Sequence, residues 1–296
     1  MSNFIHMLHK STIQLLRFPF SFFLLPVYLF ALSQVVSPHW GHALLIFFIL
    51  HVLVYPASNG YNSYMDRDES SIGGIKTPLQ PTRQLFMVTV LMDIAAVGMG
   101  LFIDMYFAAG LSLYILASRA YSYRGIRLKK YPLAGYLTVV IFQGAVTYWL
   151  VNYGCHRQPE WRFPPDLLRG MLASSLLIGG FYPLTQVYQH EADAKDGVKS
   201  ISRLLGYRGT FLFTAIVYMG AFAVLAVHFF AQLEGSKFYV LATCLLPVLV
   251  YFNVWAIRVW KNTAAANFDN TMRMNLLASC CTNIAFIILI IWNLLE

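Results

Sequence analysis

Two short polar segments interrupt an otherwise apolar chain, and their residue types are suited to binding a metal ion. The first cassette is residues 62–69, and the second cassette is residues 189–196. Each begins with an amide, followed four residues later by an aspartate and three residues after that by another carboxylate. The two sets are Asn62, Asp66, Glu69 and Gln189, Asp193, Asp196. On a continuous helix, the three positions of each set share one face.

The acidic side chains of the cassettes favour a magnesium site. Six of the 13 carboxylates in the chain lie there: Asp66, Asp68, Glu69, Glu191, Asp193 and Asp196. Acids at a membrane edge are costly unless they are paired, and a ligand set made only of oxygens suits Mg²⁺, which often bridges phosphates. Asp68 and Glu191 are second choices, because a continuing helix would place them opposite the shared face. The predicted metal ligands are Asn62, Asp66, Asp68, Glu69, Gln189, Glu191, Asp193 and Asp196.

Basic residues near the cassettes supply charge for a diphosphate. A glycine and a cation follow each cassette, in Gly74-Ile75-Lys76-Thr77 and in Gly197-Val198-Lys199-Ser200. A basic loop over residues 121–129 adds Tyr123, Arg124, Arg127 and Lys129. Cationic side chains bind phosphate oxygens through charge-assisted hydrogen bonds, so the cassettes together predict a site for a Mg-diphosphate. The alternative is that the cassette acids are solvated loop charges that neutralise nearby cations. This would readily explain a single cassette, but it explains less well why two cassettes have the same spacing.

The composition is that of an integral membrane protein. Hydrophobic residues make up 58% of the 296-residue chain and charged residues 11%, with a mean hydropathy of +0.59. Soluble proteins are roughly 45–50% apolar and about 25% charged. Nine segments approach the ~20 residues that a bilayer requires. They are residues 18–36, 42–58, 85–103, 106–121, 133–152, 167–188, 210–231, 238–257 and 274–295. We therefore expect an all-α polytopic protein with about nine transmembrane helices.

The distribution of cations predicts an orientation. If the N-terminus is cytoplasmic, all 21 Lys and Arg residues lie on that side except Arg157, Arg162, Arg169 and Lys237. This bias follows the positive-inside rule and opens both cassettes to the cytoplasm. The net charge of +8 lies beside membrane spans, which favours anionic lipid or phosphate as partner and argues against nucleic acid.

The two cassettes indicate an internal repeat. One ends the second predicted span and the other ends the sixth, so a four-span unit occurs twice, with a final span after it. We expect a single integral-membrane domain over residues 1–296, in which parallel repeats bring the cassettes face to face across a central cavity. Asp93, near the middle of the third span, is either a functional residue or a buried, paired one.

Several segments together resemble UbiA-type intramembrane prenyltransferases over nearly the whole chain. They are Arg17-Phe18-Pro19, Asn62-x-x-x-Asp66, the basic loop, the second cassette and Gly197-Val198-Lys199-Ser200, in the family's order. The resemblance implies nine helices around a cavity and two motifs that bind Mg²⁺ and an isoprenoid diphosphate. The family's first motif usually reads Asn-Asp-x-x-Asp-x-x-x-Asp, whereas this chain has Ser63 and Ser70 at its second and last places. The second motif begins with Gln189 in place of an aspartate.

The resemblance also implies the reaction. Mg²⁺ and cations would stabilise a departing diphosphate, and the allylic cation would alkylate an aromatic or other lipophilic acceptor in a dry cavity. Asp66, Asp193, Arg127 and Lys199 are the expected catalytic residues. The expected substrate-binding residues are Asn62, Lys76, Tyr123, Arg124, Arg127, Lys129, Gln189 and Lys199. Two alternatives are a UbiA-like terpene cyclase, which would form its product from the donor alone, and a transporter of an anionic lipid or metabolite.

Overall fold

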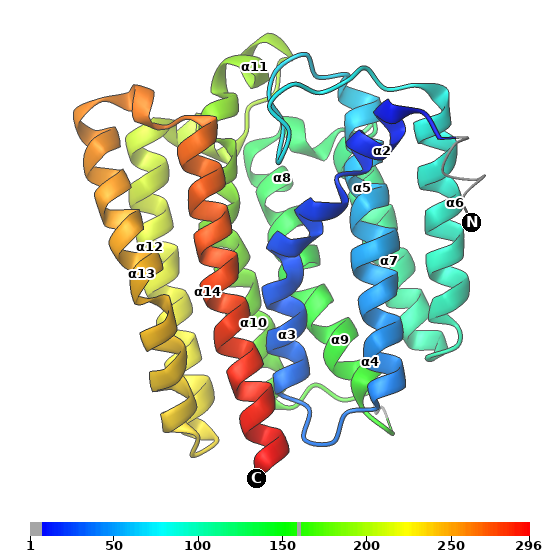
Figure 1. The fold of residues 1–296 in the computed structure, drawn as a ribbon, viewed down its shortest axis with the longest axis vertical. Helices are drawn as coiled ribbons and strands as arrows, with labels where there is room; N and C mark the ends of the chain where they lie inside the picture. Colours follow the sequence, from blue (N-terminus) through cyan, green and yellow to red (C-terminus); the bar gives the residue numbers. More distant parts are fainter. Residues whose placement is uncertain (1–7, 159–160) are drawn as a thin grey trace. The chain divides into compact units, whose positions relative to one another are not determined.

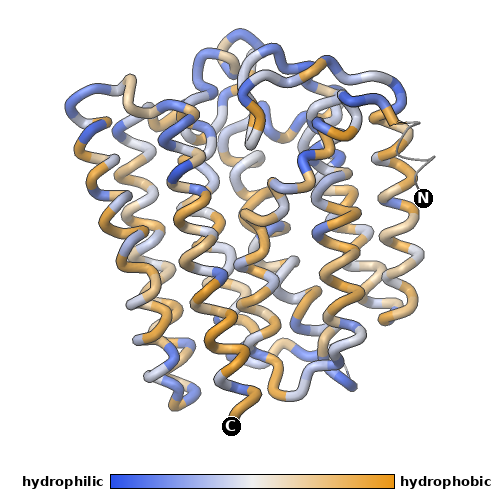
Figure 2. Tube along the Cα trace, in the orientation of Figure 1, coloured by the Kyte–Doolittle hydropathy of each residue, from blue (hydrophilic) through white to orange (hydrophobic). Residues whose placement is uncertain are grey.

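Helices make up most of the part of the chain that the structure describes. The computed structural model describes residues 8–158 and 161–296 (Figure 1). Within these ranges the β-type pairing is a single bridge between Ile72 and Ile75. Hydrophobic residues dominate the helices, and hydrophilic residues concentrate in the loops and at the helix ends (Figure 2). An all-α architecture is therefore confirmed.

Each of the nine predicted spans corresponds to a helical segment in the described residues. In chain order they are α2 (Lys10–Leu16) with η1 (Phe18–Leu24) and α3 (Leu25–Ser33); α4 (Trp40–Phe47) with η2 (Phe48–Val54) and α5 (Tyr55–Asp66); α6 (Arg83–Gly100); α7 (Met105–Ser122); α8 (Pro132–Val139) with η4 (Val140–Val146) and α9 (Thr147–Cys155), preceded by η3 (Leu128–Lys130); α10 (Pro165–Phe181) with η5 (Tyr182–Gln189) and α11 (His190–Lys195); α12 (Ile201–Ala231); α13 (Gly235–Lys261) with η6 (Thr263–Ala265); and α14 (Phe268–Leu295). Eight of the nine are long and apolar enough to cross a membrane. The remaining one, α7, is less apolar because Ser112, Arg119 and Ser122 interrupt it.

Prolines explain why the helices that lead to the cassettes are irregular. A proline inside a helix has no N–H to donate, and its ring clashes with the carbonyl four residues earlier. Immediately before Pro56 the helix widens into the π-helical segment η2, and at Pro183 it tightens into the 3₁₀ segment η5. Such departures from α geometry are frequent at functional sites. The chain therefore reaches each cassette through a distorted turn.

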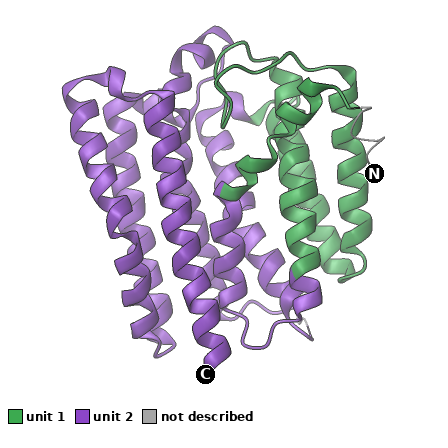
Figure 3. Ribbon diagram, viewed as in Figure 1, with its two compact units in different colours: residues 1–22, 44–128 green, residues 23–43, 129–296 purple. Residues whose placement is uncertain are grey.

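The helices pack as two compact units. Unit 1 comprises residues 1–22 and 44–128, and unit 2 comprises residues 23–43 and 129–296 (Figure 3). In unit 1, α2 and α6 pack on α5 around a buried cluster of Leu15, Leu16, Ile72 and Leu85. Unit 2 has a larger buried cluster at the junction of η5, α12, α13 and α14. Its members are Leu184, Val187, Phe211, Trp255, Val259, Ala266 and Met274.

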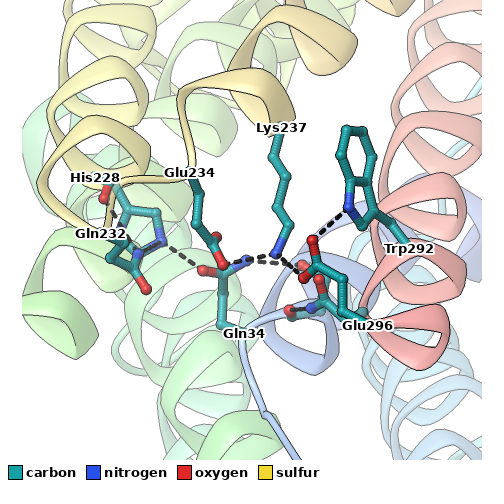
Figure 4. Close-up of polar contacts among 9 residues, drawn as sticks. Gln34, His228, Gln232, Glu234, Lys237, Trp292 and Glu296 are labelled. Carbon is teal, nitrogen blue, oxygen red and sulfur yellow. Dashed lines mark hydrogen bonds and ion pairs between the residues drawn. The ribbon is translucent and has the colours of Figure 1, made fainter.

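A polar network joins the helices of unit 2 at the end of α12 opposite the second cassette (Figure 4). The Lys237 ammonium lies 2.6 Å from Glu234 Oε1 and 3.6 Å from Glu296 Oε2. Beside it, His228 Nε2 is 2.7 Å from Gln34 Oε1. These contacts link α3, α12, α13 and α14, and they pair Lys237 with Glu234 and Glu296 and His228 with Gln34.

Candidate functional site

The first cassette lies at the end of α5, in unit 1. Asp66 is the last residue of the helix, and Arg67 adopts a left-handed conformation with φ of 54°. The helix therefore stops before Asp68 and Glu69. Our expectation that Asn62, Asp66 and Glu69 share one helical face is wrong for Glu69, because the left-handed turn at Arg67 redirects the chain.

Residues at the end of α7 hold the first cassette. The Ser122 hydroxyl donates to Asn62 Oδ1 over 2.8 Å. Arg124 Nε donates to the carbonyl of Met65 over 2.6 Å, and Arg124 Nη2 donates to the carbonyl of Asp66 over 3.3 Å. Two side chains from the basic loop region thus fix the last turn of α5. The Arg124 contacts go to backbone oxygens, which makes this arginine a structural clamp on the cassette.

The Asp66 carboxylate of the first cassette is almost buried. Its side chain is 5% exposed, and its Oδ1 lies 3.6 Å from Nη2 of Arg127, whose side chain is 11% exposed. Arg127 sits in a left-handed turn with φ of 53°, and its N–H donates to the carbonyl of Tyr123 over 2.7 Å. The basic loop therefore folds back on itself and brings a guanidinium to the aspartate. Tyr123 is about half exposed, at 49%.

Asp93, left open by the sequence, is paired. Arg119 of α7 donates to Asp93 Oδ2 through both Nε, over 2.8 Å, and Nη2. Arg119 Nη2 also reaches the carbonyl of Thr89 over 3.3 Å, and the guanidinium carbon lies 4.1 Å from the centroid of the Tyr61 ring. Tyr61 immediately precedes Asn62. The Asp93–Arg119 pair thus positions the turn of α5 that carries the first cassette.

The loop after the first cassette is attached to the N-terminal helix. Arg17 is 8% exposed and donates to the carbonyls of Asn59 and Gly73, over 3.1 Å and 3.4 Å. Ile72 and Ile75 exchange backbone hydrogen bonds of 2.9 Å around Gly74, whose φ of 81° suits glycine. Lys76 follows this turn with an exposed side chain.

The second cassette spans the end of η5 and the whole of α11, in unit 2. Gln189 is the last residue of η5, and Asp193 lies in α11 with its Oδ2 accepting a hydrogen bond of 2.9 Å from Ser200. Glu191 and Asp196 are exposed, and Asp196 lies just beyond α11. As in the first cassette, the third acidic position is not on the same helix as the aspartate.

The segment after the second cassette turns back toward Asp193. Gly197 has φ of 67°, and the N–H of Val198 donates to the carbonyl of Asp193 over 2.8 Å. The N–H of Lys199 donates to the carbonyl of Lys130 over 3.3 Å, next to Lys129 of the basic loop, while the Lys199 side chain is exposed. Arg203 Nη1 donates to the carbonyl of Val198 over 2.7 Å. Lys199 is therefore held by its backbone, with its ammonium free to reach solvent.

The residues that precede the two cassettes are also similar in sequence. A Tyr-Pro pair stands six residues before each amide, as Tyr55-Pro56 before Asn62 and as Tyr182-Pro183 before Gln189. A tyrosine also immediately precedes each amide. This longer pattern places both cassettes after a proline-distorted turn, and it is the signal in the sequence that most directly supports the predicted repeat. That the two cassettes face one another stays a prediction.

Unit 2 contains an apolar pocket of about 510 Å³. Helix α10 contributes Phe181, α12 contributes Phe222, and α13 contributes Leu246 and Phe252, with α3 and α14 completing the wall. A buried aromatic layer lies at the end of the pocket away from the second cassette. There Phe30 is 4.8 Å from Phe286 and 5.1 Å from Tyr148, measured between ring centroids. A pocket of this size and polarity suits a small lipophilic ligand.

Comparison with protein families identifies this arrangement. The sequence profile of the UbiA prenyltransferase family matches residues 20–277. The chain belongs to this family. A comparison with curated protein sequences finds no match.

Solved structures of UbiA homologues have the same fold. The apo structure of a UbiA homologue from Aeropyrum pernix K1 superposes with a TM-score of 0.68 at 17% identity, covering 92% of this chain and 98% of that one. A UbiA homologue from Archaeoglobus fulgidus bound to GPP and Mg²⁺ gives 0.63 at 16% identity, covering 95% and 99%. A structure described as digeranylgeranylglyceryl phosphate synthase gives 0.61 at 16% identity, covering 97% and 99%. The UbiA fold of an integral, multi-pass membrane protein is therefore confirmed.

The donor chemistry of the UbiA cassettes fits a hard divalent cation. Their candidate metal ligands are carboxylate and amide oxygens, the ligand type that Mg²⁺ prefers. Within residues 8–158 and 161–296, no three His, Cys, Asp or Glu side chains form a preassembled metal site. Ser122, Ser200, Arg119 and Arg203, which sequence reasoning missed, support the cassettes from outside.

Proposed function

We propose that the protein transfers an isoprenoid chain from an allylic diphosphate to an aromatic or other lipophilic acceptor, with Mg²⁺. The observation that carries the proposal is shared by both cassettes. In each, the side chain of one aspartate contacts a neighbouring side chain, and a cationic residue is close by. Asp66 lies beside Arg127, and Asp193 accepts from Ser200 next to Lys199. Family membership and the A. fulgidus homologues bound to GPP or DMAPP with Mg²⁺ support this chemistry.

The cassette residues have distinct roles in this proposal. Asp66 and Asp193 are the primary Mg²⁺ ligands, because both are anchored by neighbouring side chains. Asp68 or Glu69, which follow the end of α5, complete the set in the first cassette, and Glu191 or Asp196 completes it in the second. Bound Mg²⁺ would neutralise the diphosphate and so stabilise its departure. Asn62 and Gln189 contribute amide oxygens at the start of each cassette.

The cations divide into those that bind diphosphate and those that hold the protein. Lys76 and Lys199 have exposed side chains beside the cassettes, so we assign them to the phosphate oxygens. Arg127 forms an ion pair with Asp66, and its guanidinium can donate hydrogen bonds to a diphosphate bound beside that aspartate. Tyr123 and Lys129 are the remaining candidates of the basic loop. Arg124 acts through the backbone of α5.

The apolar pocket of unit 2 supports an isoprenoid donor. Phe181 lines the pocket, and η5 leads from there to Gln189 of the second cassette. At about 2.0 Å per residue, this 3₁₀ segment spans roughly 16 Å. A chain of several isoprene units attached to a diphosphate has dimensions of this order. We infer that the isoprenoid chain occupies the pocket while its diphosphate is held at the second cassette.

The decisive experiment measures pyrophosphate release by purified protein. DMAPP, GPP and longer allylic diphosphates are supplied with and without Mg²⁺ and a membrane extract containing acceptors, and the organic products are identified by mass spectrometry. Asp66→Asn and Asp193→Asn should each abolish Mg-dependent release. Asp166→Asn, which removes an exposed acid at the far end of α10, should not.

The products separate the proposal from its alternatives. A prenylated acceptor supports transfer. A hydrocarbon or terpene alcohol formed from the donor alone would assign the protein to cyclisation. Absence of release from every donor, combined with uptake of an anionic lipid by sealed vesicles, would assign it to transport.

A further inference from the structure

A groove runs along the outer surface of α13 and α14 in unit 2. Its volume is about 580 Å³. On α13 it is lined by Leu246, Val250, Val254 and Arg258, which recur every four residues and so lie on one face of the helix. The first three are 54%, 62% and 42% exposed. The groove is therefore an apolar strip that faces away from the core of unit 2 and ends in a cation.

The length of the groove matches one leaflet of a bilayer. Leu246 and Arg258 are twelve positions apart, which at 1.5 Å per residue is about 18 Å along the helix. Half of a ~30 Å hydrocarbon core is about 15 Å. The apolar part of the groove is thus about as long as a single acyl layer is deep. In a bilayer that α13 spans, Arg258 would lie at the level of the headgroups, on the same side as the second cassette within unit 2.

The polar end of the groove is available for a ligand. Asn270 of α14 lines it opposite Arg258, and Lys261 follows Arg258 by less than one helical turn with an exposed side chain. Arg258 is exposed, and its guanidinium makes no hydrogen bond or ion pair with the rest of the described chain. Arg208 of α12 differs, because its guanidinium donates to the carbonyl of Trp260 over 2.8 Å.

We propose that this groove binds an anionic phospholipid from the adjacent leaflet. An acyl chain would lie along Leu246, Val250 and Val254, and the phosphodiester would accept hydrogen bonds from Arg258. The charge selects this occupant. A phosphodiester carries a single negative charge, which one guanidinium balances, whereas a diphosphate needs several cations and usually a metal ion. Anionic lipid surfaces attract cations placed in this way.

The groove adjoins the interior pocket. Leu246 lines both the groove and the pocket of about 510 Å³, so its side chain is part of the wall between them. A lipid in the groove would pack against the outer surface of that wall. This site is independent of the prenyl-transfer proposal, since neither cassette contributes to it.

The test measures lipid retention in native mass spectrometry. Full-length protein is equilibrated with equal amounts of phosphatidylglycerol and phosphatidylcholine of identical acyl chains. Wild type should retain phosphatidylglycerol preferentially. Arg258→Gln should lower that retention about fivefold, the effect of losing one cation near an anionic headgroup. The matched control is Arg273→Gln, which removes an exposed cation of α14 that does not line the groove.

A second pair of variants tests the apolar part without changing charge. Val250→Trp should fill the groove and reduce retention of the lipid. Ile257→Trp, at a position on α13 that is 57% exposed but outside the groove, should leave retention unchanged.

Three outcomes would overturn the assignment. If Arg258→Gln and Arg273→Gln lost equal amounts of bound phosphatidylglycerol, the retention would reflect general attraction by surface charge and not a site in the groove. Displacement of the phospholipid by a prenyl diphosphate, with a higher donor KM in Arg258→Gln, would make the groove a donor site. A dimer that dissociates only in Val250→Trp would make it an interface between copies of the chain. Pyrophosphate release, measured in parallel, reports on the proposed enzymatic function separately.

Discussion

Removing Arg119 tests whether the Asp93–Arg119 pair positions the first cassette. Arg119→Met leaves the Asp93 carboxylate, 15% exposed, without its cation among the membrane helices. Breaking a buried pair by removing one partner costs about 3–5 kcal/mol, and we take the lower figure because neither side chain is fully buried. A loss of about 3 kcal/mol lowers the midpoint of thermal unfolding by roughly 6–12 °C in a protein of this size.

The double variant Asp93→Leu/Arg119→Met should be more stable than either single variant. It leaves no unpaired charge and loses chiefly the contact of the guanidinium with Tyr61, worth about 1 kcal/mol, so its midpoint should fall by roughly 2–4 °C. The assay is thermal unfolding of purified protein in detergent for wild type, Asp93→Leu, Arg119→Met and the double variant. Arg83→Met, which removes an exposed cation at the start of α6, is the control and should change stability by less than about 0.5 kcal/mol.

The activity of the same variants links the pair to the cassette. If prenyl transfer depends on the placement of Asn62 and Asp66, pyrophosphate release by Arg119→Met at a temperature where it is folded should fall more than roughly tenfold, because displacements near 1 Å are costly to catalysis. Additive destabilisation in the double variant would refute the energetic coupling. Normal release by folded Arg119→Met would refute the positioning role.

Five further outcomes are expected. Ser200→Ala removes both the hydroxyl that donates to Asp193 and the cap of α12, so stability should fall by about 1 kcal/mol, and the Mg²⁺ concentration for half-maximal release should rise, as measured by titration. Gly206→Ala should destabilise by about 1–3 kcal/mol in thermal unfolding, because φ of 70° with ψ of 176° is a region that glycine alone occupies readily. Gly98→Ala, where an added methyl group meets nothing within 4 Å, should instead be neutral or stabilise by up to about 1 kcal/mol. Arg127→Gln should strengthen Mg²⁺ binding to the free protein, because the cation beside Asp66 is removed. The same variant should weaken diphosphate binding. Both affinities can be measured by calorimetry, and a change of both in the same direction would contradict the prediction. Phe222→Ala should enlarge the pocket and shift the ratio of kcat/KM values toward longer diphosphates, whereas Ala215→Phe should shift it toward shorter ones.

Hydropathy was sufficient to predict where the helices lie, because a bilayer imposes a minimum apolar length on each span. It could not predict how the cassette helices end. Arg67 and Arg127 adopt left-handed conformations that the sequence does not announce, since non-glycine residues occupy that region only when tertiary contacts support them. The contacts of Arg124 with the end of α5 and of Arg127 with Asp66 provide such support.

The sequence showed which polar residues were candidates for a role, but it did not show which side chains they contact. Asp93 and Arg119 are 26 residues apart on different helices, and nothing in the periodicity of either span distinguishes a paired aspartate from a ligand-binding one. Ser122 and Ser200 carry no chemical signature of their own, because serine is common at helix ends. The repeated Tyr-Pro pair is the one supporting feature that the sequence does reveal, because the pair has the same spacing from Asn62 as from Gln189.

The second cassette is coupled to the apolar pocket through one helix. Ser200 donates to Asp193 and caps α12, and two to four turns beyond the break at Gly206, α12 contributes Ala215 and Phe222 to the pocket wall. A helix transmits displacement along its axis because its backbone hydrogen bonds resist compression. A carboxylate moved by a bound ion would therefore shift the start of α12, while the non-helical break at Gly206 would absorb part of that movement before it reached the pocket. The break at Gly206, in a conformation that glycine adopts readily, thus separates the end of α12 beside the second cassette from the part that lines the apolar pocket.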